Sequence, residues 1–413
     1  MNEREPGRAE DLGAARRFTA FAALMAVYAA YAFCWNTENF LRPYIADALH
    51  LSRAQVASFY SAQAAGALLG AVTLPQVADR SSRRNLLALC AFGFGLAAIG
   101  ALLVDSYSSA LAQRFAMGVF LGGVFGCTVS LYVGLFPPAM RGLMAGIVQL
   151  VYNGGDATLS WIGRHFAADW QIVMAAGGAG AIVAAGLVML FTPDDRRVLP
   201  WGSISPRPDR PRRSSIVELF DARYLAVTLR LALMCGLNFF AFQAFNGWIT
   251  TYLKEFHQFG PDEVGRLLTV LHIGSMIGAI AWGMLADRIG RRFNAAGFLL
   301  CAILIVVYIT VPPTFALLAA SGFAYGLCLA ASSIWGPYFA EMYPEHLRAT
   351  AASIFNWGRI VSLFGAIVAG LVAERFGLVT IMLTGAVAFV AAAVVWWSLP
   401  ETVARRVPTS NSA

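Results

Sequence analysis

The chain alternates long apolar segments with short polar ones, and this alternation limits the possible folds more than any other feature. It divides into twelve apolar segments of roughly 18 to 25 residues, each long enough for a helix that crosses about 30 Å of hydrocarbon. Hydrophobic residues make up 58% of the 413 residues and charged residues only 13%, which excludes a soluble globular protein. The expected fold is an all-α membrane protein with twelve transmembrane helices.

Two similar stretches occupy corresponding places in the two halves of the chain. Residues 283–292 read GMLADRIGRR, and residues 75–84, which lie 208 positions earlier, read PQVADRSSRR. In the later stretch Gly290 permits a tight turn, and Gly283 permits the close approach of a neighbouring helix. The arginines mark both stretches as cytoplasmic loops, and Asp287 is expected to pair with an arginine or to cap the next helix. The chain is therefore expected to be an internal repeat of two six-helix halves.

GMLADRIGRR resembles the signature loop of the major facilitator superfamily, in which this loop follows the second helix of each half. The upstream copy departs from the pattern at Pro75 and Ser82. The resemblance implies two pseudo-symmetric six-helix bundles that rock about a site at mid-membrane, with the loops acting as a conformational latch. The latch residues that it assigns are Asp79, Arg80, Gly283, Asp287, Arg288 and Arg291.

A change of composition separates the two halves. Residues 193–222 contain DDRR, RPDRPRR and several prolines, and such a segment cannot bury enough apolar surface to form a domain. The expected organisation is a cytoplasmic tail at 1–17, an N-terminal bundle at 18–192, a cytoplasmic basic linker at 193–222, a C-terminal bundle at 223–399 and a cytoplasmic tail at 400–413. The first helix is expected at 18–40, with Arg42 in the outer loop that follows. The Pro-Asp-Asp sequence after the sixth helix corresponds to Pro400 and Glu401 after the twelfth, with Asp194 matched to Glu401.

The net charge of +7 reflects the distribution of basic residues between the two sides of the membrane. Of the 30 Lys and Arg residues, 21 fall in the N-terminal tail and in segments expected inside, 6 fall outside and 3 fall within helices. This asymmetry follows the positive-inside rule and predicts a multi-pass protein of the cell inner membrane with both termini in the cytoplasm. The basic character therefore does not indicate a nucleic-acid partner.

The motifs of soluble enzymes are missing from the sequence. It contains no phosphate-binding loop, no paired CxxC and no nucleophile elbow, and its six cysteines are scattered singly without metal-ligand spacing. We therefore expect no enzyme activity, no metal and no cofactor. A proton gradient is the expected energy source, the lipid bilayer the expected surroundings, and a monomer the expected state.

Ionisable residues inside a membrane are candidates for function because burying their charge is costly. One of them, Arg359, lies mid-way along the eleventh apolar segment, where a guanidinium can bind a carboxylate through two parallel hydrogen bonds. The alternative is a structural role, either a salt bridge between helices or hydrogen bonds to backbone carbonyls. The segment resembles the helix-eleven arginine region of aromatic acid and sialate-type proton symporters. Arg230 lies near the start of the seventh segment, so its side chain is expected to extend to the inner surface.

Four further residues are candidates for proton coupling. Glu38 lies where aromatic acid symporters carry an Asp-Gly-Phe-Asp motif, although this chain has Asn-Thr-Glu-Asn there; its alternative place is just outside the membrane edge. Arg114, four residues before a glycine, is similar to the helix-four pattern of that family, or pairs with Asp105 or Glu38. Asp156 is a second possible proton carrier, or a buried partner of Arg114 or Arg359. His272 titrates in a useful range, or is a packing residue.

Polar residues of the seventh segment are similar to a signature of carboxylate permeases in the sialate and lactate group, with Asn238, Asn246 and Thr250 at matching spacings. Other positions of that signature differ, so no substrate follows from it. The residues expected to contact the substrate are Arg359, Asn356, Asn238, Asn246, Tyr152, Gln149 and Trp357.

Three functions are consistent with these residues. The favoured one is proton-coupled uptake, by symport and alternating access, of a small organic anion such as a monocarboxylate or an aromatic acid. The second is proton-driven efflux of drugs or metabolites, against which three intramembrane arginines argue because they disfavour cationic cargo. The third is a receptor or scaffold that transports nothing, and it gives the buried charges no function.

Overall fold

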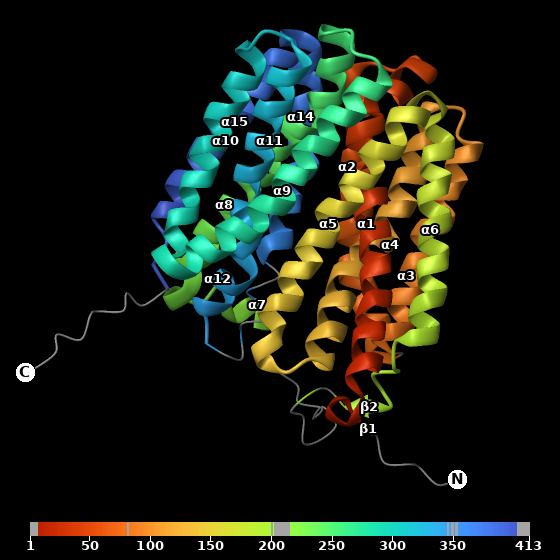
Figure 1. The fold of residues 1–413 in the computed structure, drawn as a ribbon, viewed down its shortest axis with the longest axis vertical. Coiled ribbons are helices and arrows are strands. Elements are labelled where there is room, and N and C mark those ends of the chain that lie inside the picture. The colour runs from red at the N-terminus through yellow and green to blue at the C-terminus, as the bar shows by residue number, and fades with distance from the viewer. Residues whose placement is uncertain are drawn as a thin grey trace, which may run out of the picture.

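The structure, a computed structural model, describes residues 7–80, 82–199, 201, 215–344, 347, 351 and 354–402, and this part of the chain is almost entirely helical (Figure 1). Its one sheet is a short parallel pair of β1 (Gly7–Arg8) and β2 (Val198–Leu199). This pair joins the segment before the first helix to the segment after the sixth. The expected N-terminal tail and linker are thus tied together within the described residues.

Twelve long helices lie within the described ranges, as the apolar segments predict. The N-terminal bundle consists of α1 (Ala14–Ala48), α2 (Arg53–Arg80), α3 (Arg83–Ile99), α4 (Tyr107–Leu135), α5 (Pro138–Phe166) and α6 (Trp170–Phe191). The C-terminal bundle consists of α8 (Ala222–Thr251), α9 (Pro261–Ile289), α10 (Ala295–Thr310), α11 (Phe315–Leu329), α14 (Ile354–Phe376) and α15 (Leu378–Trp397), with the short helices α7 (Ser215–Glu218) and α12 (Trp335–Glu341) beside it. By length and hydropathy these helices make eleven membrane-crossing stretches. One of the eleven, Leu143–Phe191, has 49 residues and runs from α5 through a turn at Ala167–Asp169 to the end of α6, so two helices are counted as one stretch.

The two bundles stand side by side (Figure 1). Three helices of each form most of the interface between them. In this interface α5 packs against α9, α2 against α14 and α1 against α8. The start of α1, the β1–β2 pair and the end of α15 lie at the same end of the molecule, which we call the terminal face. The end that carries the α1–α2 and α8–α9 connections is the opposite face.

Glycines bring α2 against α4 and, at corresponding positions, α9 against α11. A Cβ atom at Gly70 would lie within 3.0 Å of the backbone of Val119, and one at Gly278 within 3.0 Å of the backbone of Leu327. Both members of the second contact lie 208 residues after those of the first, which is also the spacing of the two loop motifs. Helices in lipid associate through such close packing. The same offset relates two more pairs of contacts: Gly66 with Phe115 and Gly274 with Phe323; Gly118 with Gln63 and Gly326 with Leu271.

We expect Gly278→Ala to lower the stability of the protein, because the new methyl group would overlap the backbone of α11. Overpacking of this kind costs about 1–3 kcal/mol. The matched control is Gly186→Ala on α6, where a Cβ meets no atom within 4 Å and alanine favours the helix by about 1 kcal/mol. Thermal unfolding in detergent should give a lower midpoint for Gly278→Ala only; equal midpoints for the two variants would contradict this packing.

The later loop motif forms a network at the terminal face. Asp287 pairs with Arg291 at 2.6 Å, and Arg291 also pairs with Glu341 of α12 at 3.0 Å. The carboxylate of Glu401, just after α15, accepts the backbone N–H groups of Arg291 and Arg292 at 2.9 and 3.0 Å. Gly290 has a φ of +129°, as a tight turn requires. The loop therefore ties the end of α9 to α12 and to the segment after α15.

The sequence predictions for the two loops concern Gly283, the counterpart of Glu401 and the latch residues. Among the described residues, no neighbouring atom lies within 4 Å of a Cβ position at Gly283, so the expected close helix approach there is wrong for this conformation. In the N-terminal half Asp195 accepts the backbone N–H groups of Arg83 and Arg84, both at 3.2 Å, so Asp195 and not Asp194 is the counterpart of Glu401. Arg288 is exposed. The side chains of Asp79 and Arg80 lie outside the described residues.

Candidate functional site

Arg359 lies at the interface between the bundles, surrounded by aromatic rings of both. Its Nη2 donates a hydrogen bond to the Tyr31 hydroxyl of α1 at 3.0 Å. Its Cζ lies 4.1 Å from the ring centroid of Trp35 on α1 and 5.8 Å from that of Phe239 on α8. A guanidinium held in this way has an aromatic environment and a geometry suited to a carboxylate.

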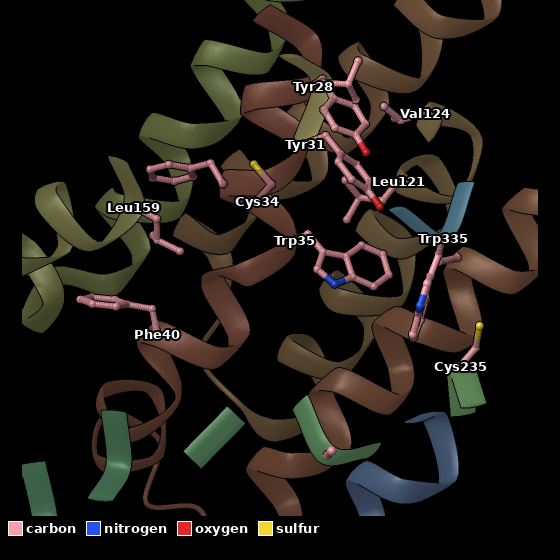
Figure 2. Packing of buried hydrophobic residues seen from close by; sticks show 14 of the residues in the cluster. Tyr28, Tyr31, Cys34, Trp35, Phe40, Leu121, Val124, Leu159, Cys235 and Trp335 are labelled. Carbon is pink, nitrogen blue, oxygen red and sulfur yellow. The ribbon is translucent and has the colours of Figure 1, made fainter. Parts of the chain in front are cut away.

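Helical spacing explains why α1 supplies several of these rings. Positions 28, 31 and 35 are three and four residues apart, and Figure 2 shows Tyr28, Tyr31 and Trp35 along the same side of α1, with Phe40 on the other side toward Leu159. Tyr31 stacks on Tyr28 at 5.3 Å between centroids and lies 6.1 Å from Tyr152 of α5. We call these five residues, Tyr28, Tyr31, Trp35, Tyr152 and Phe239, the aromatic cage.

A second polar cluster joins α1, α5 and α9. The Asp156 carboxylate accepts a hydrogen bond from Asn36 Nδ2 at 2.5 Å through one oxygen, and its other oxygen lies 3.9 Å from Nδ1 of His272. Asn36 Nδ2 also lies 3.2 Å from the hydroxyl of Tyr152, a member of the aromatic cage. The cluster borders a cavity of about 30 Å³, enough for water-sized ligands but not for an aromatic acid.

The contacts of Asp156 bear on its alternatives. Its carboxylate accepts from Asn36 and lies near His272, so the alternative role as a buried partner of Arg114 or Arg359 is wrong. The neighbouring Asn153 donates to the backbone carbonyl of Gln149 and does not bind Asp156. His272 Nδ1 has no hydrogen-bond partner within the described residues, and its role in proton coupling stays a prediction. We call the 3.9 Å approach between the two bundles the Asp156–His272 pair.

A third cluster, also buried, contains Glu38, Arg42 and Arg114. Arg42 donates to one oxygen of Glu38 from Nε and Nη2 at 2.9 and 2.6 Å, and both side chains are at most 2% exposed. Glu38 is thus buried inside the protein. Arg114 Nη1 donates to Thr37 Oγ1 at 2.8 Å and to Gln63 Oε1 at 3.4 Å, so a pairing with Asp105 is wrong.

Sequence reasoning did not name Tyr31, Trp35 and Asn36 as site residues, and it placed Arg42 outside the first helix. Arg42 was expected in an outer loop because the first helix was expected to end at position 40, but α1 continues through Pro43 to Ala48. A signal was available, since Glu38 and Arg42 are spaced i, i+4, the spacing of helical ion pairs. The guanidinium also lies over the Trp248 ring of α8, 4.5 Å from its centroid.

Comparison with known proteins gives the family. The family model described as Major Facilitator Superfamily matches residues 24–260 and 231–413. The chain belongs to this superfamily. It is therefore a membrane transporter and not an enzyme, and the resemblance of the signature loop is confirmed.

Curated relatives cover most of the length of this major facilitator transporter. It is 26% identical to the gallate transporter of Pseudomonas putida, over 81% of this chain and 80% of the relative. It is 25% identical to a probable 4-methylmuconolactone transporter of Cupriavidus pinatubonensis, over 94% and 92%, and 24% identical to the 4-hydroxybenzoate transporter of Acinetobacter baylyi, over 79% of each.

Solved structures agree on the fold. A point mutant of the nucleoside transporter NupG superposes with a TM-score of 0.73 at 16% identity, covering 92% of this chain and 99% of that one. A D-xylose–proton symporter superposes with a TM-score of 0.72 at 15% identity, covering 93% and 98%. These neighbours confirm the expected arrangement of two six-helix bundles.

The remaining expected substrate contacts have varied positions in the transporter. Asn246 Oδ1 accepts a hydrogen bond from Tyr325 at 2.6 Å and lines the small cavity beside Asp156. Asn238 is buried and Gln149 half-buried. Trp357 stacks on Phe220, before α8, at 5.6 Å and 3° between ring planes, and the side chain of Asn356 lies outside the described residues. Arg230 reaches the backbone carbonyl of Ser398 at 2.9 Å, at the end of α15 near the terminal face.

The transporter is closed at its opposite face. Three ion pairs join the bundles there: Lys254 with Asp47, Arg53 with Glu255 at 2.7 Å, and Arg164 with Asp262 at 3.8 Å. Close backbone contacts reinforce them, since a Cβ at Gly265 would overlap α5 and one at Gly370 would overlap α2.

Proposed function

We propose that this transporter takes up an aromatic acid, or a related organic acid anion, together with protons. The observation that carries the proposal is Arg359 in its aromatic cage at the bundle interface. The guanidinium would bind the carboxylate, and the rings would stack on the aryl group. The curated relatives named for gallate, 4-hydroxybenzoate and muconate support an acid of this class.

The cage also suits alternating access. Tyr31 and Trp35 belong to the N-terminal bundle, whereas Arg359 and Phe239 belong to the C-terminal bundle. A substrate held by both sets would favour the conformation in which the bundles meet around it, because a ligand shifts an equilibrium toward the state that it binds better. The site lies within one chain, so the proposed unit of transport is a monomer.

Proton coupling is assigned to the Asp156–His272 pair and to Glu38, with Arg114 as an electrostatic neighbour. Asn36 contacts both Asp156 and Tyr152, and Tyr152 packs beside Tyr31, which binds Arg359. This contiguous path offers a physical route by which a proton at Asp156 and an anion at Arg359 would influence one another. Neutralising the buried acid makes reorientation of the loaded carrier less costly.

The basic loops support a cytoplasmic location for the terminal face and for both termini. The closed opposite face is then the outer face of the inner membrane, and the structure is a conformation that has closed toward the outside. The loop network around Asp287, Arg291 and Glu401 would act as a latch that changes when the terminal face closes.

The test is uptake into proteoliposomes of radiolabelled benzoate, 4-hydroxybenzoate, gallate, lactate and sialate, with and without an inward proton gradient. We expect one or more of the aromatic acids to accumulate, and an uncoupler to abolish that accumulation. Failure of all five acids to enter, combined with proton-driven efflux of cationic or neutral aromatics, would contradict the proposal and establish an exporter.

A further inference from the structure

Arg42 lies between two cavities where α1 crosses α8. On the side of the opposite face is a cavity of about 320 Å³, whose lining includes Arg42, Asp47, Trp248 and Thr251. On the other side is the cavity of about 30 Å³ beside Asp156, whose lining includes Asn39, Asn246 and Thr250. Residues close together on α1 and α8 thus line different cavities, and the point where these two helices cross separates the two cavities.

The Arg42 guanidinium fills this crossing. It lies over the Trp248 ring, and a Cβ atom at Gly247 would lie 3.3 and 3.4 Å from its two Nη atoms. The absence of a side chain at Gly247 therefore leaves the space that the guanidinium occupies. Both Arg42 and Trp248 are buried, so this contact excludes water from the path between the cavities.

The outer ion pairs form a separate and weaker layer. The side chains of Arg53 and Glu255 are 36% and 35% exposed, and Asp47 is more exposed still. Exposed pairs contribute little to stability and are screened by salt. We call the buried Arg42–Trp248 contact the seal, because it lies between the two cavities and is shielded from water and salt.

The charge on Glu38 holds this seal in place. Oε1 of Glu38 accepts both hydrogen bonds from Arg42, while Oε2 has no hydrogen-bond partner within the described residues. The charged groups that act on Glu38 are Arg42 on its own helix and Arg114 on α4. Gln63 of α2 accepts a hydrogen bond from Arg114, and Trp248 of α8 lies against Arg42, so the residues of α2 and α8 that contact these arginines do not titrate. The Asp156–His272 pair of α5 and α9 lies beside Asn36, earlier along α1.

We propose that Arg42 is the inner gate of the opposite face and that protonation of Glu38 opens it. A neutral Glu38 would leave two buried arginines without a counter-charge, and an open, hydrated crossing relieves that cost. The coupling is reciprocal: when Arg42 returns to the carboxylate and seals the crossing, the proton must leave Glu38. Only the use of this proton for uptake rests on the proposed function; the gate itself does not.

The gate can be tested with a single reporter cysteine that needs no substrate. Ile249 lines the small cavity and is 2% exposed, so an Ile249→Cys thiol reports access past Arg42. A membrane-impermeant maleimide is added to intact cells or to inverted vesicles, and labelling is normalised to the denatured protein at the same pH. The chain without the reporter gives the background of its native cysteines.

We expect Arg42→Gln and Glu38→Gln each to raise the rate of labelling from the opposite face about tenfold or more. The matched control, Lys254→Gln, removes an outer pair and should change the rate less than about twofold, as expected for an exposed pair. Lowering the pH should raise labelling in the parent chain but not in Glu38→Gln. Thermal unfolding shows which variants are folded, and Arg42→Lys, which keeps the charge, gives a second reading should Arg42→Gln fail to fold.

An unchanged labelling rate in folded Arg42→Gln or Arg42→Lys would overturn the gate. A rate that rises equally in Lys254→Gln would overturn the assignment of the seal to the inner layer, and the same response to pH in parent and Glu38→Gln would overturn the role of Glu38. Because labelling requires no transport, failure of acid uptake would count against the proposed function and leave this result standing.

Discussion

Arg359→Ala is expected to abolish accumulation of the aromatic acid, with a loss of about 100-fold or more in uptake efficiency. The physical reason is that the substrate carboxylate would enter a cage of Tyr31, Trp35 and Phe239 without a cation to bind it. Removing one partner of a buried charge pair costs about 2–5 kcal/mol, because the other charge is left buried and unpaired. The measurement is the initial rate of gradient-driven uptake in proteoliposomes at several acid concentrations.

Two further variants separate charge from geometry at this position. Arg359→Lys keeps the charge but loses the planar fork, so we expect it to recover only a small part of the uptake. Tyr31→Phe removes the hydroxyl that receives the 3.0 Å hydrogen bond from Arg359, and should weaken apparent affinity more than maximal rate. Arg230→Gln is the matched control, since that arginine lies near the terminal face. Wild-type uptake in Arg359→Ala would refute the role of Arg359 in binding.

The fold could be predicted from the sequence because its main signals are local and repeated. The length of each apolar segment fixes the number of crossings, and the loop motif repeated after 208 residues fixes the correspondence of the halves. The same offset reappears in the contacts of Gly70 with Val119 and of Gly278 with Leu327. Gly290 was correctly expected in an unusual backbone conformation, because a loop this short leaves few alternatives.

The partners of the buried charges could not be predicted in the same way. The pairing of Asp156 with His272 depends on how α5 packs against α9, and no spacing along the chain encodes a contact between residues so far apart. Arg42 was misplaced for a different reason: the first helix was expected to end at position 40, whereas α1 continues to Ala48. It does so through Pro43, which removes a backbone hydrogen bond, a loss for which neighbouring helices can compensate within a membrane. An error of a few residues at the end of α1 therefore moved a buried charge to the surface.

Asp156→Asn is expected to abolish proton-driven accumulation while leaving exchange of the acid across the membrane intact. The amide has the shape of the carboxylic acid but carries no exchangeable charge, so it resembles Asp156 fixed in its protonated form. Net uptake requires release of the proton on the inner side, which the amide cannot provide. Exchange of labelled for unlabelled acid requires no net proton movement and should persist, with less dependence on pH.

The comparison of accumulation with exchange also tests the partner histidine. In His272→Gln we expect both activities to remain but accumulation to be reduced, because Asp156 would keep its hydrogen bond from Asn36 and lose only the contact at 3.9 Å. Asp262→Asn at the exposed opposite face is the matched carboxylate control and should behave as the parent chain. If Asp156→Asn still accumulates the acid against a gradient, another residue carries the proton. Glu38 beside Arg42 is then the carrier, as well as the residue that controls the gate.

If exchange is lost together with accumulation, Asp156 holds the bundles in their working geometry. Its contact with Asn36 then serves structure and not proton transfer.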